Sequence, residues 1–209
     1  MNIFELYNTE LERIKNGQYK FEPSLTIEEY NKYVYKLLND QTKNKNEKGL
    51  TNELLISGNL HRSGYNTIVL NDRNKDYDIS ISKDGKENFI ECKFDNLAHT
   101  TNNFYFECWN YTYNKPTGII CTNLNTLYTH TYFNAHEQRY YFLSGKRKVF
   151  LKAIFDILAV DKNAVRTYQN TYYTSQGLVG DAAYIVPIDT FLKHFKGNNT
   201  LLEPRLRWC

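Results

Sequence analysis

Apolar residues recur along this chain with two different periods, and each period predicts a different kind of element. A spacing of three to four residues predicts amphipathic helices over 1–16 and 26–41, and the polar run 40–48 separates them from the rest of the chain. The same spacing predicts a third helix over 50–63, which Gly64 ends. The first 45 residues are therefore expected to form a helical arm ahead of the main part of the chain.

Apolar runs after Gly64 predict a set of strands, and beyond residue 124 the pattern becomes mixed. Strands are expected at 65–70, 76–82, 87–94, 103–109, 117–122 and 182–188, and helices at 146–160 and 190–195. This order predicts the α/β fold class, with a mixed central sheet flanked by helices. We expect a helical N-terminal arm over 1–45 and one main domain over 46–209, which ends in a helical C-terminal extension.

Composition adds little chemistry, but it excludes several classes of protein. The chain has 209 residues and a net charge of +3, which permits a buried core and is too weakly basic to indicate nucleic-acid binding by itself. Its four cysteines form no C-x-x-C pair and no zinc-type cluster, so reduced thiols are expected. No secretion signal is visible, and no apolar run reaches the roughly 20 residues of a membrane helix. We therefore expect a protein of the bacterial or host-cell cytoplasm, with no membrane partner.

The most informative stretch is KDYDISISKDGKENFIECKFD. Asp84-Gly85 is a preferred pair for a two-residue hairpin turn, because such a turn needs positive φ at both positions. With this turn at the tip, Asp78 falls opposite Glu91, and Asp76 falls opposite Lys93. Directly opposed side chains share a face, with their Cβ atoms about 5 Å apart. The register therefore predicts that Asp78 and Glu91 meet.

Two opposed carboxylates should destabilise a strand pair unless a cation lies between them. Mg²⁺ is a hard cation that prefers carboxylate oxygens, so it would remove the repulsion between Asp78 and Glu91. Lys93 follows Glu91 by two residues on the same predicted face, where its ammonium could reach a water or phosphate near the metal. Solvated charges on an exposed hairpin would show the same spacing, but the derived register favours a metal site.

The segment from the third predicted helix to the fifth predicted strand resembles the core of the PD-(D/E)XK nuclease superfamily. In that core, a helix bearing a glutamate precedes a strand and a hairpin that carries D…(D/E)-x-K. Asp78, Glu91 and Lys93 match the two acids and the lysine of this motif. Glu53, in TNELLISGNLHRSGYNTIVL, matches the helical glutamate, whereas Tyr77 stands where the motif has proline. The phage-type and Holliday-junction-resolvase-like branches look most similar.

The resemblance implies a restriction-endonuclease-like core that hydrolyses phosphodiester bonds, with a DNA endonuclease as the expected activity. It implies that one or two Mg²⁺ ions, for which Mn²⁺ should substitute, bind to Asp78, Glu91, Glu53 and the main-chain carbonyl of Cys92. Lys93 would position or activate the attacking water. A homodimer is compatible with this activity, because duplex cleavage commonly needs two active sites.

Two other functions remain open for the same sequence pattern. The first is a catalytically silent protein of the nuclease fold that serves as a nucleic-acid-binding or protein-interaction module. The second is an RNA endonuclease with the same metal chemistry, because residues outside the motif recognise the 2′-hydroxyl. The intact acid–acid–lysine set favours a catalyst, and DNA is the preferred expectation.

Several further residues could contribute to function or could have ordinary structural roles. Asp76 is more readily an ion-pair partner of Lys93 than a metal ligand. Glu107 could be a further acid near the site or the polar member of a half-buried strand, and His61 is more readily a packing residue than a site residue. Groups that could contact nucleic acid, but could equally be surface residues, are Lys115, the basic run 146–148 and the tyrosines within 168–173.

Overall fold

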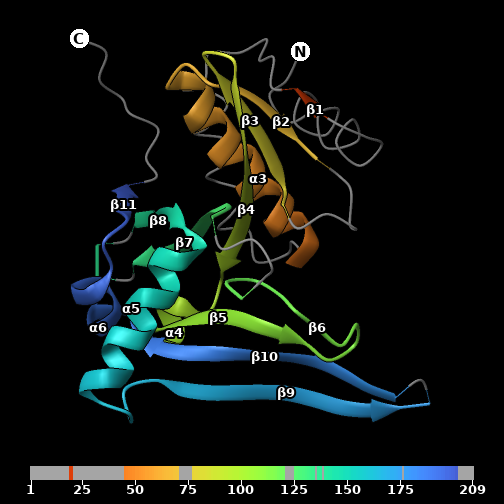
Figure 1. The fold of residues 1–209 in the computed structure, drawn as a ribbon, viewed down its shortest axis with the longest axis vertical. Coiled ribbons are helices and arrows are strands. Elements are labelled where there is room, and N and C mark those ends of the chain that lie inside the picture. The colour runs from red at the N-terminus through yellow and green to blue at the C-terminus, as the bar shows by residue number, and fades with distance from the viewer. Residues whose placement is uncertain are drawn as a thin grey trace. The chain divides into compact units, whose positions relative to one another are not determined.

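The structure is a computed structural model that describes residues 19–20, 45–70, 77–120, 125–134, 136–137, 139–175 and 177–201. These residues form an α/β protein, and the chain divides into two compact units (Figure 1). The first unit runs to Phe94, and the second covers Asp95–Leu201. The predicted arm helices over 1–16 and 26–41 lie outside the described residues.

In its described residues, the first unit combines one long helix with antiparallel strands. The strands are neighbours in the order β1, β2, β3, β4. The helix starts five residues earlier than the predicted segment and ends before Gly64, whose φ of +83° reverses the chain. The elements are β1 (Tyr19–Lys20), α3 (Lys45–Arg62), β2 (Asn66–Val69), β3 (Ile79–Lys83) and β4 (Lys86–Asp95).

The core of the first unit is formed by α3 and by one face of the strands. Ser57 on α3 donates a buried hydrogen bond to the Thr67 hydroxyl on β2, with 2.7 Å between the oxygens. This bond and the apolar burial around it fix α3 against the strands. The buried apolar side chains include Leu54, Leu55, Ile56, Val69, Ile79, Ile81 and Ile90. The side chains of Ile79, Ile81 and Ile90 therefore anchor the β3–β4 hairpin in this core.

The described part of the second unit contains two groups of antiparallel strands and three helices. One group has the order β7, β8, β11, and the other is a sheet with the order β6, β5, β10, β9. The elements are α4 (Ala98–Thr101), β5 (Asn103–Asn110), β6 (Lys115–Pro116), β7 (Leu127–Asn134), β8 (Arg139–Lys146), α5 (Arg147–Val160), β9 (Arg166–Thr174), β10 (Gly177–Pro187), α6 (Ile188–His194) and β11 (Asn198–Leu201).

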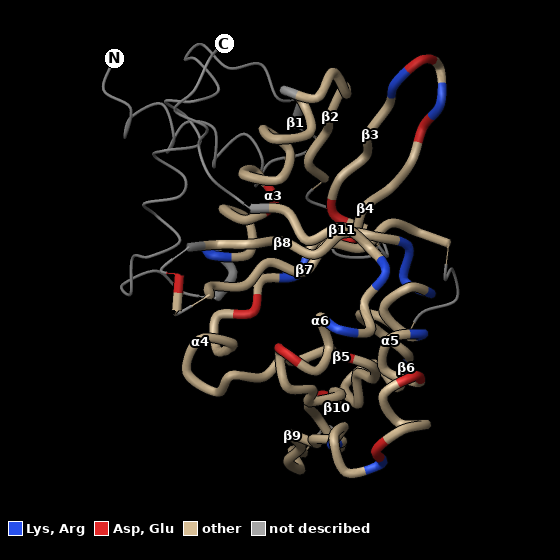
Figure 2. Tube along the Cα trace, turned by 90° about the vertical axis from the view of Figure 1, so that its left-hand side faces the viewer, with Lys and Arg blue, Asp and Glu red and all other residues tan. Residues whose placement is uncertain are grey.

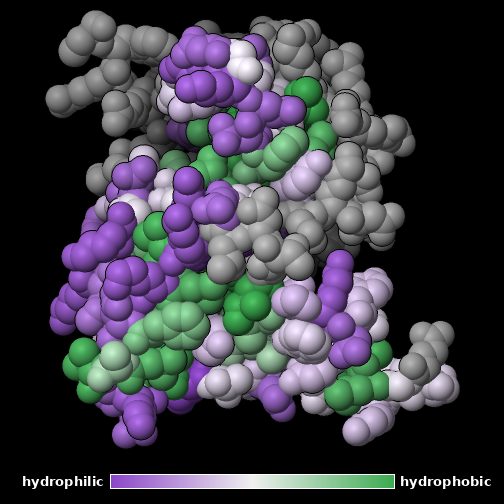
Figure 3. Space-filling model, viewed as in Figure 1, coloured by the Kyte–Doolittle hydropathy of each residue, from purple (hydrophilic) through white to green (hydrophobic). Residues whose placement is uncertain are grey.

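Aromatic rings dominate the core of the second unit. Phe106 on β5 lies 4.8 Å from Phe191 on α6, between ring centroids, and Phe150 on α5 lies 4.6 Å from Phe195. Such pairs add specific orientation to the area that they bury. The helix α5 buries one face in this core and leaves Phe155 exposed on the other. Figure 3 shows apolar residues at the surface over the lower part of this helix.

Two predictions about the second half of the chain were wrong. The expected helical C-terminal extension is instead mainly β-structure with two helices between the strands, among the residues described after 124. The strand expected at 117–122 is a turn over 117–120. Gly118 has φ of +59° there, and a Cβ atom on it would lie 2.3 Å from the carbonyl oxygen of Glu107, so the close chain approach ends the extended backbone.

Candidate metal-binding and catalytic site

The β3–β4 hairpin has the turn and register that the sequence predicts. Asp84 and Gly85 have φ of 52° and 73°, as a two-residue turn of this kind requires. Lys83 pairs with Lys86, and the ladder continues regularly to the pair of Ile79 and Ile90. Figure 2 shows charged residues gathered at the tip of this hairpin. The hairpin therefore confirms the expected alignment from the turn as far as Ile79, the residue next to Asp78.

At Asp78 the regular ladder ends, which corrects the predicted pair of Asp78 and Glu91. The Asp78 N–H donates to the carbonyl of Ile90 at 2.8 Å, and the register already assigns Ile90 to Ile79. The Asp78 carbonyl accepts from the N–H of Leu70 at 2.7 Å. The main chain thus turns at this point, because its two polar groups serve different neighbouring strands.

The Asp78 carboxylate replaces a main-chain carbonyl as the hydrogen-bond acceptor for one N–H of β4. Its Oδ2 accepts the N–H of Cys92, with 2.7 Å between the heavy atoms. A charged acceptor makes this bond stronger than an ordinary main-chain bond. In an extended strand, the N–H and C=O of one residue point to the same side, so the Cys92 carbonyl is also directed to the side on which Asp78 lies.

Glu91 and Lys93 form an ion pair along one face of β4. The Lys93 Nζ lies 2.8 Å from Glu91 Oε1, and the side chains are 30% and 10% exposed, respectively. The alternation of side chains along a strand explains why residues two apart can meet on the same face. The partner predicted for Lys93 was Asp76, which lies outside the described residues.

Glu53 on α3 interacts electrostatically with Asp78, Glu91 and Lys93. Burial raises the pKa of Glu53 well above the ordinary glutamate value of 4.5, and the nearby carboxylates of Asp78 and Glu91 raise it further. The Lys93 ammonium acts in the opposite direction and lowers the pKa. Three carboxylates and one ammonium, from α3, β4 and the residue before β3, therefore share one site, which we call the acidic cluster.

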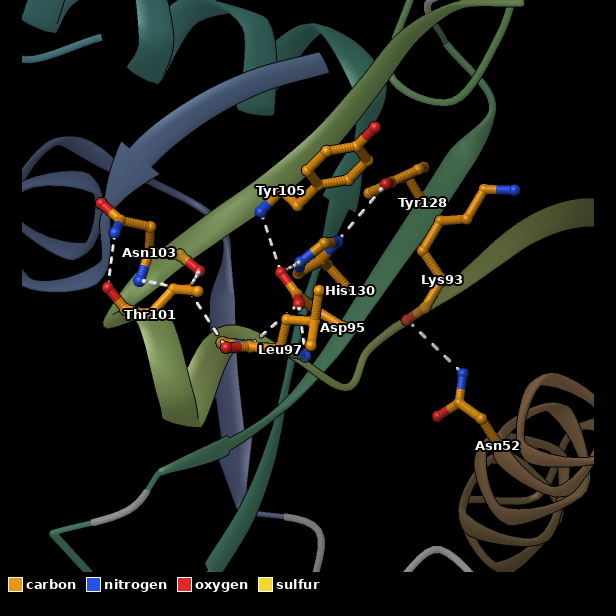
Figure 4. A network of polar contacts seen from close by, with 10 residues as sticks. Asn52, Lys93, Asp95, Leu97, Thr101, Asn103, Tyr105, Tyr128 and His130 are labelled. Atoms are coloured by element: carbon orange, nitrogen blue, oxygen red, sulfur yellow. Dashed lines mark hydrogen bonds and ion pairs between the residues drawn. The ribbon is translucent and has the colours of Figure 1, made fainter. Parts of the chain in front are cut away.

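Asn52 is a site residue that the sequence pattern did not indicate. Its side chain is 1% exposed, and its Nδ2 donates to the main-chain carbonyl of Lys93 at 3.5 Å (Figure 4). Its Oδ1 has no hydrogen-bond partner among the described residues. Because Asn52 adjoins Glu53, this contact fixes the helix that carries Glu53 against the strand that carries Glu91 and Lys93. Residue spacing carried no signal of this contact, because Asn52 donates to a main-chain carbonyl.

The donor chemistry of the acidic cluster fits a hard divalent cation. Carboxylate and main-chain carbonyl oxygens are the ligands that Mg²⁺ accepts, and a cation would relieve the carboxylate repulsion that adds to the effect of burial on the pKa of Glu53. Among the described residues, no three His, Cys, Asp or Glu side chains are already arranged around a metal position. Glu91 is instead turned to Lys93, and Asp78 to the N–H of Cys92. One oxygen of each of these two carboxylates is therefore already engaged by a group of the protein.

The remaining candidates have other surroundings. His61 lies near the end of α3 and is half-buried. Arg147 is 1% exposed, so within the basic run 146–148 only the two lysines are available to a phosphate. Glu107 and Lys115 belong to β5 and β6 of the second unit, and the tyrosines within 168–173 belong to β9.

The second unit contains a buried polar network around Asp95 that the sequence did not reveal. Asp95 Oδ1 accepts the N–H groups of Leu97 and Ala98, at 3.1 and 3.0 Å. Its Oδ2 accepts the N–H of Tyr105 at 2.8 Å and lies 3.3 Å from Nε2 of His130 (Figure 4). Both side chains are almost fully buried, so this carboxylate organises the chain around α4 and the start of β5.

Comparisons with known proteins identify no relative. No protein-family model matches the sequence, and neither the curated proteins nor the solved structures contain a significant match. No helix within the described ranges is both long and apolar enough to cross a membrane.

Proposed function

We propose that this protein is a metal-dependent nuclease that hydrolyses phosphodiester bonds, with DNA as its substrate. The observation that carries the proposal is that the carboxylates of Asp78 and Glu91 interact electrostatically with the buried Glu53: burial raises the pKa of Glu53 most, and the two carboxylates raise it further. Grouped carboxylates that destabilise one another are typical of a functional site, because stability alone disfavours them.

The local fold supports the same proposal. The helix α3 carries the glutamate, β2 follows it, and the β3–β4 hairpin carries the D…E-x-K residues. This is the order expected of a restriction-endonuclease-like core, and we propose that the first unit is such a core.

The residues proposed to hold Mg²⁺ are Asp78, Glu91, Glu53 and, through its carbonyl, Cys92. When bound, the cation would supply Lewis-acid activation of water and neutralise charge on the phosphate. The Asp78 carboxylate is held in place by the N–H of Cys92, so one of its oxygens is oriented before any ligand arrives. Such preorganisation lowers the cost of assembling the site.

Lys93 is proposed to act on the reacting groups once Glu91 is engaged by the cation. Its ammonium is partly exposed and lies next to a carboxylate of the cluster, so it can hold a water molecule or a phosphate oxygen there. A positive charge at that position stabilises the charge that develops on the phosphate during attack. Asn52 would keep the main chain of Lys93 in position.

Calorimetric titration with Mn²⁺ tests the metal site. The wild-type protein should bind Mn²⁺, and Asp78→Asn should lose binding while remaining folded. Asp84→Asn is the matched control, because it makes the same change at the exposed hairpin tip, where Asn tolerates positive φ. Equal binding by the wild type and Asp78→Asn would exclude the proposed ligand set.

A substrate panel tests the activity. Single-stranded, duplex and branched DNA, and RNA, should be incubated with Mg²⁺, Mn²⁺ or EDTA and with the wild type or Lys93→Ala. The proposal expects cleavage of DNA that needs the cation and is lost in Lys93→Ala. Cleavage of RNA alone would identify an RNA endonuclease, and metal binding without any cleavage would identify a catalytically silent module.

A further inference from the structure

The sheet of the second unit has two edges of opposite character. The edge strand β6 has two residues, Lys115 and Pro116, and both residue types prevent strand addition. The other edge strand, β9, has nine residues, RTYQNTYYT, with no proline and no lysine. Arg166, its first residue, carries its sole charge. One edge is therefore protected and the other is open among the described residues.

The side chains of β9 are also exposed on both of its faces. Tyr168, Tyr172 and Tyr173 are 49%, 63% and 84% exposed. Because side chains alternate along a strand, Tyr168 and Tyr172 share one face and Tyr173 lies on the other. Figure 1 shows β9 at the outer edge of the sheet, and Figure 3 shows the outer part of the β9–β10 hairpin mostly in pale colours and green. Exposed aromatic side chains of this kind are typical of interaction surfaces.

The strand is already held in an extended form by its own sheet. It pairs with β10 over its whole length, from Arg166 to Thr174. The Tyr168 ring contacts the edge of the Tyr105 ring at 6.2 Å between centroids, and Gln169 Nε2 donates to the Tyr111 hydroxyl at 2.8 Å. The main chain of β9 therefore already has the extended conformation that an incoming strand would pair with. Association would lose little conformational entropy in β9.

We propose that β9 is a dimer interface, at which β9 of a second copy of this chain adds antiparallel about a two-fold axis at Asn170. In this register all nine residues are paired. Tyr168 lies opposite Tyr172 of the second copy, and the same pair recurs on the other side of the axis. Arg166 lies opposite Thr174 of the second copy, so no like charges meet.

The sequence of β9 favours a second copy over an unrelated strand, because its pattern is complementary to its own reversal. Tyr168 and Tyr172 are equidistant from Asn170, as are Gln169 and Thr171. A self-complementary patch is what a two-fold interface requires. Tyrosine pairs across neighbouring strands are among the favourable cross-strand contacts. The dimer would join two such sheets and would carry two acidic clusters.

Cysteine cross-linking tests the register directly. The two Asn170 Cα atoms would lie about 4.5–5.5 Å apart in the dimer, which suits a disulfide, so Asn170→Cys should form a covalent dimer on mild oxidation. Thr174→Cys is the matched control on the same strand, because its two copies would lie about 27 Å apart. The wild type, with Cys92 and Cys108 buried, gives the background. Cross-linking of Asn170→Cys no greater than that of Thr174→Cys would overturn the proposal.

Charge substitution at the axis tests the two-fold symmetry. Asn170→Lys or Asn170→Glu would each place like charges directly opposite each other and weaken the dimer by about five-fold. A mixture of the two variants should associate at least as well as the wild type. Sedimentation measures this, with circular dichroism to confirm folding. A wild type that stays monomeric at about 100 µM, or a mixture no better than its components, would show that the occupant is not a second copy.

Discussion

The carboxylate of Asp78 and the main-chain N–H of Cys92 are joined by a hydrogen bond of 2.7 Å across the β3–β4 hairpin. The acid proposed as a metal ligand is thus also the acceptor that completes the hydrogen bonding of β4 where the ladder ends. Its two roles, in charge and in structure, can be separated by substitution.

Asp78→Ala and Asp78→Asn should therefore differ in stability and agree in function. The alanine variant leaves the N–H of Cys92 without its acceptor, which should reduce the free energy of unfolding by about 1–3 kcal/mol. The asparagine variant keeps an oxygen for this bond and removes a negative charge from the acidic cluster. In EDTA it should be at least as stable as the wild type, while both variants lose Mn²⁺ binding. Urea denaturation provides the comparison, and equal losses of stability would contradict this division of roles.

Glu53 should make the protein less stable as the pH rises. Its pKa is raised in the folded state, so the folded protein holds a proton that the unfolded chain releases at about pH 4.5. Stability associated with this proton is present below that pH and is lost as the pH rises from 4.5 to the folded pKa. Glu53→Gln should remove this dependence, and its gain over the wild type should level off above the folded pKa.

Denaturation at a series of pH values in EDTA measures the Glu53 effect. Glu87→Gln serves as the control, because Glu87 is exposed and Gln retains the oxygen that accepts from the Ser80 hydroxyl. Parallel pH profiles for Glu53→Gln and the wild type would show that Glu53 is not held protonated.

The hydroxyl pair of Ser57 and Thr67 should couple strongly in a double-mutant cycle. Thr67→Val leaves the buried Ser57 hydroxyl without its acceptor and should cost about 1–3 kcal/mol. Adding Ser57→Ala removes the stranded group, so the double variant should be more stable than the sum of the two single changes predicts. Additive losses would indicate that other groups satisfy the two hydroxyls.

Asp95→Ala should be the most destabilising of the polar substitutions considered. It would leave three main-chain N–H groups, those of Leu97, Ala98 and Tyr105, without their shared acceptor. The expected loss exceeds about 3 kcal/mol, because each unsatisfied buried group costs at least about 1 kcal/mol. Asp95→Asn retains an acceptor and should lose less. Thermal unfolding distinguishes them, and a mild effect of the alanine variant would contradict the structural role of this carboxylate.

The part of the first unit from α3 to β4 was largely predictable because local rules determine it. The Asp84-Gly85 turn fixes the hairpin register, and the alternation of Ile79 and Ile81 predicts the buried face. The strands β7 and β9 were missed for opposite reasons. Residues 128–132 of β7 are all buried, including His130 and Thr131, and β9 is exposed on both faces. Neither strand therefore shows the alternation that a half-buried strand requires.

The members of the acidic cluster could be chosen from the sequence, but their contacts could not. A register rule extends a regular ladder, and it cannot foresee that the chain turns at Asp78 and sends its carboxylate to a main-chain N–H. The ion pair of Glu91 and Lys93 depends on side-chain rotation along one strand. Asn52 acts through a main-chain carbonyl, which leaves no pattern in residue spacing.

The bond between Asp78 and Cys92 also gives the protein an internal spectroscopic reporter. The amide proton of Cys92 senses the electron density of the carboxylate that accepts it. Any change in the charge state or occupancy around Asp78 should shift its resonance and alter its rate of exchange with solvent. Events at the acidic cluster can therefore be followed through a single nuclear magnetic resonance signal of the main chain, without a label on the substrate.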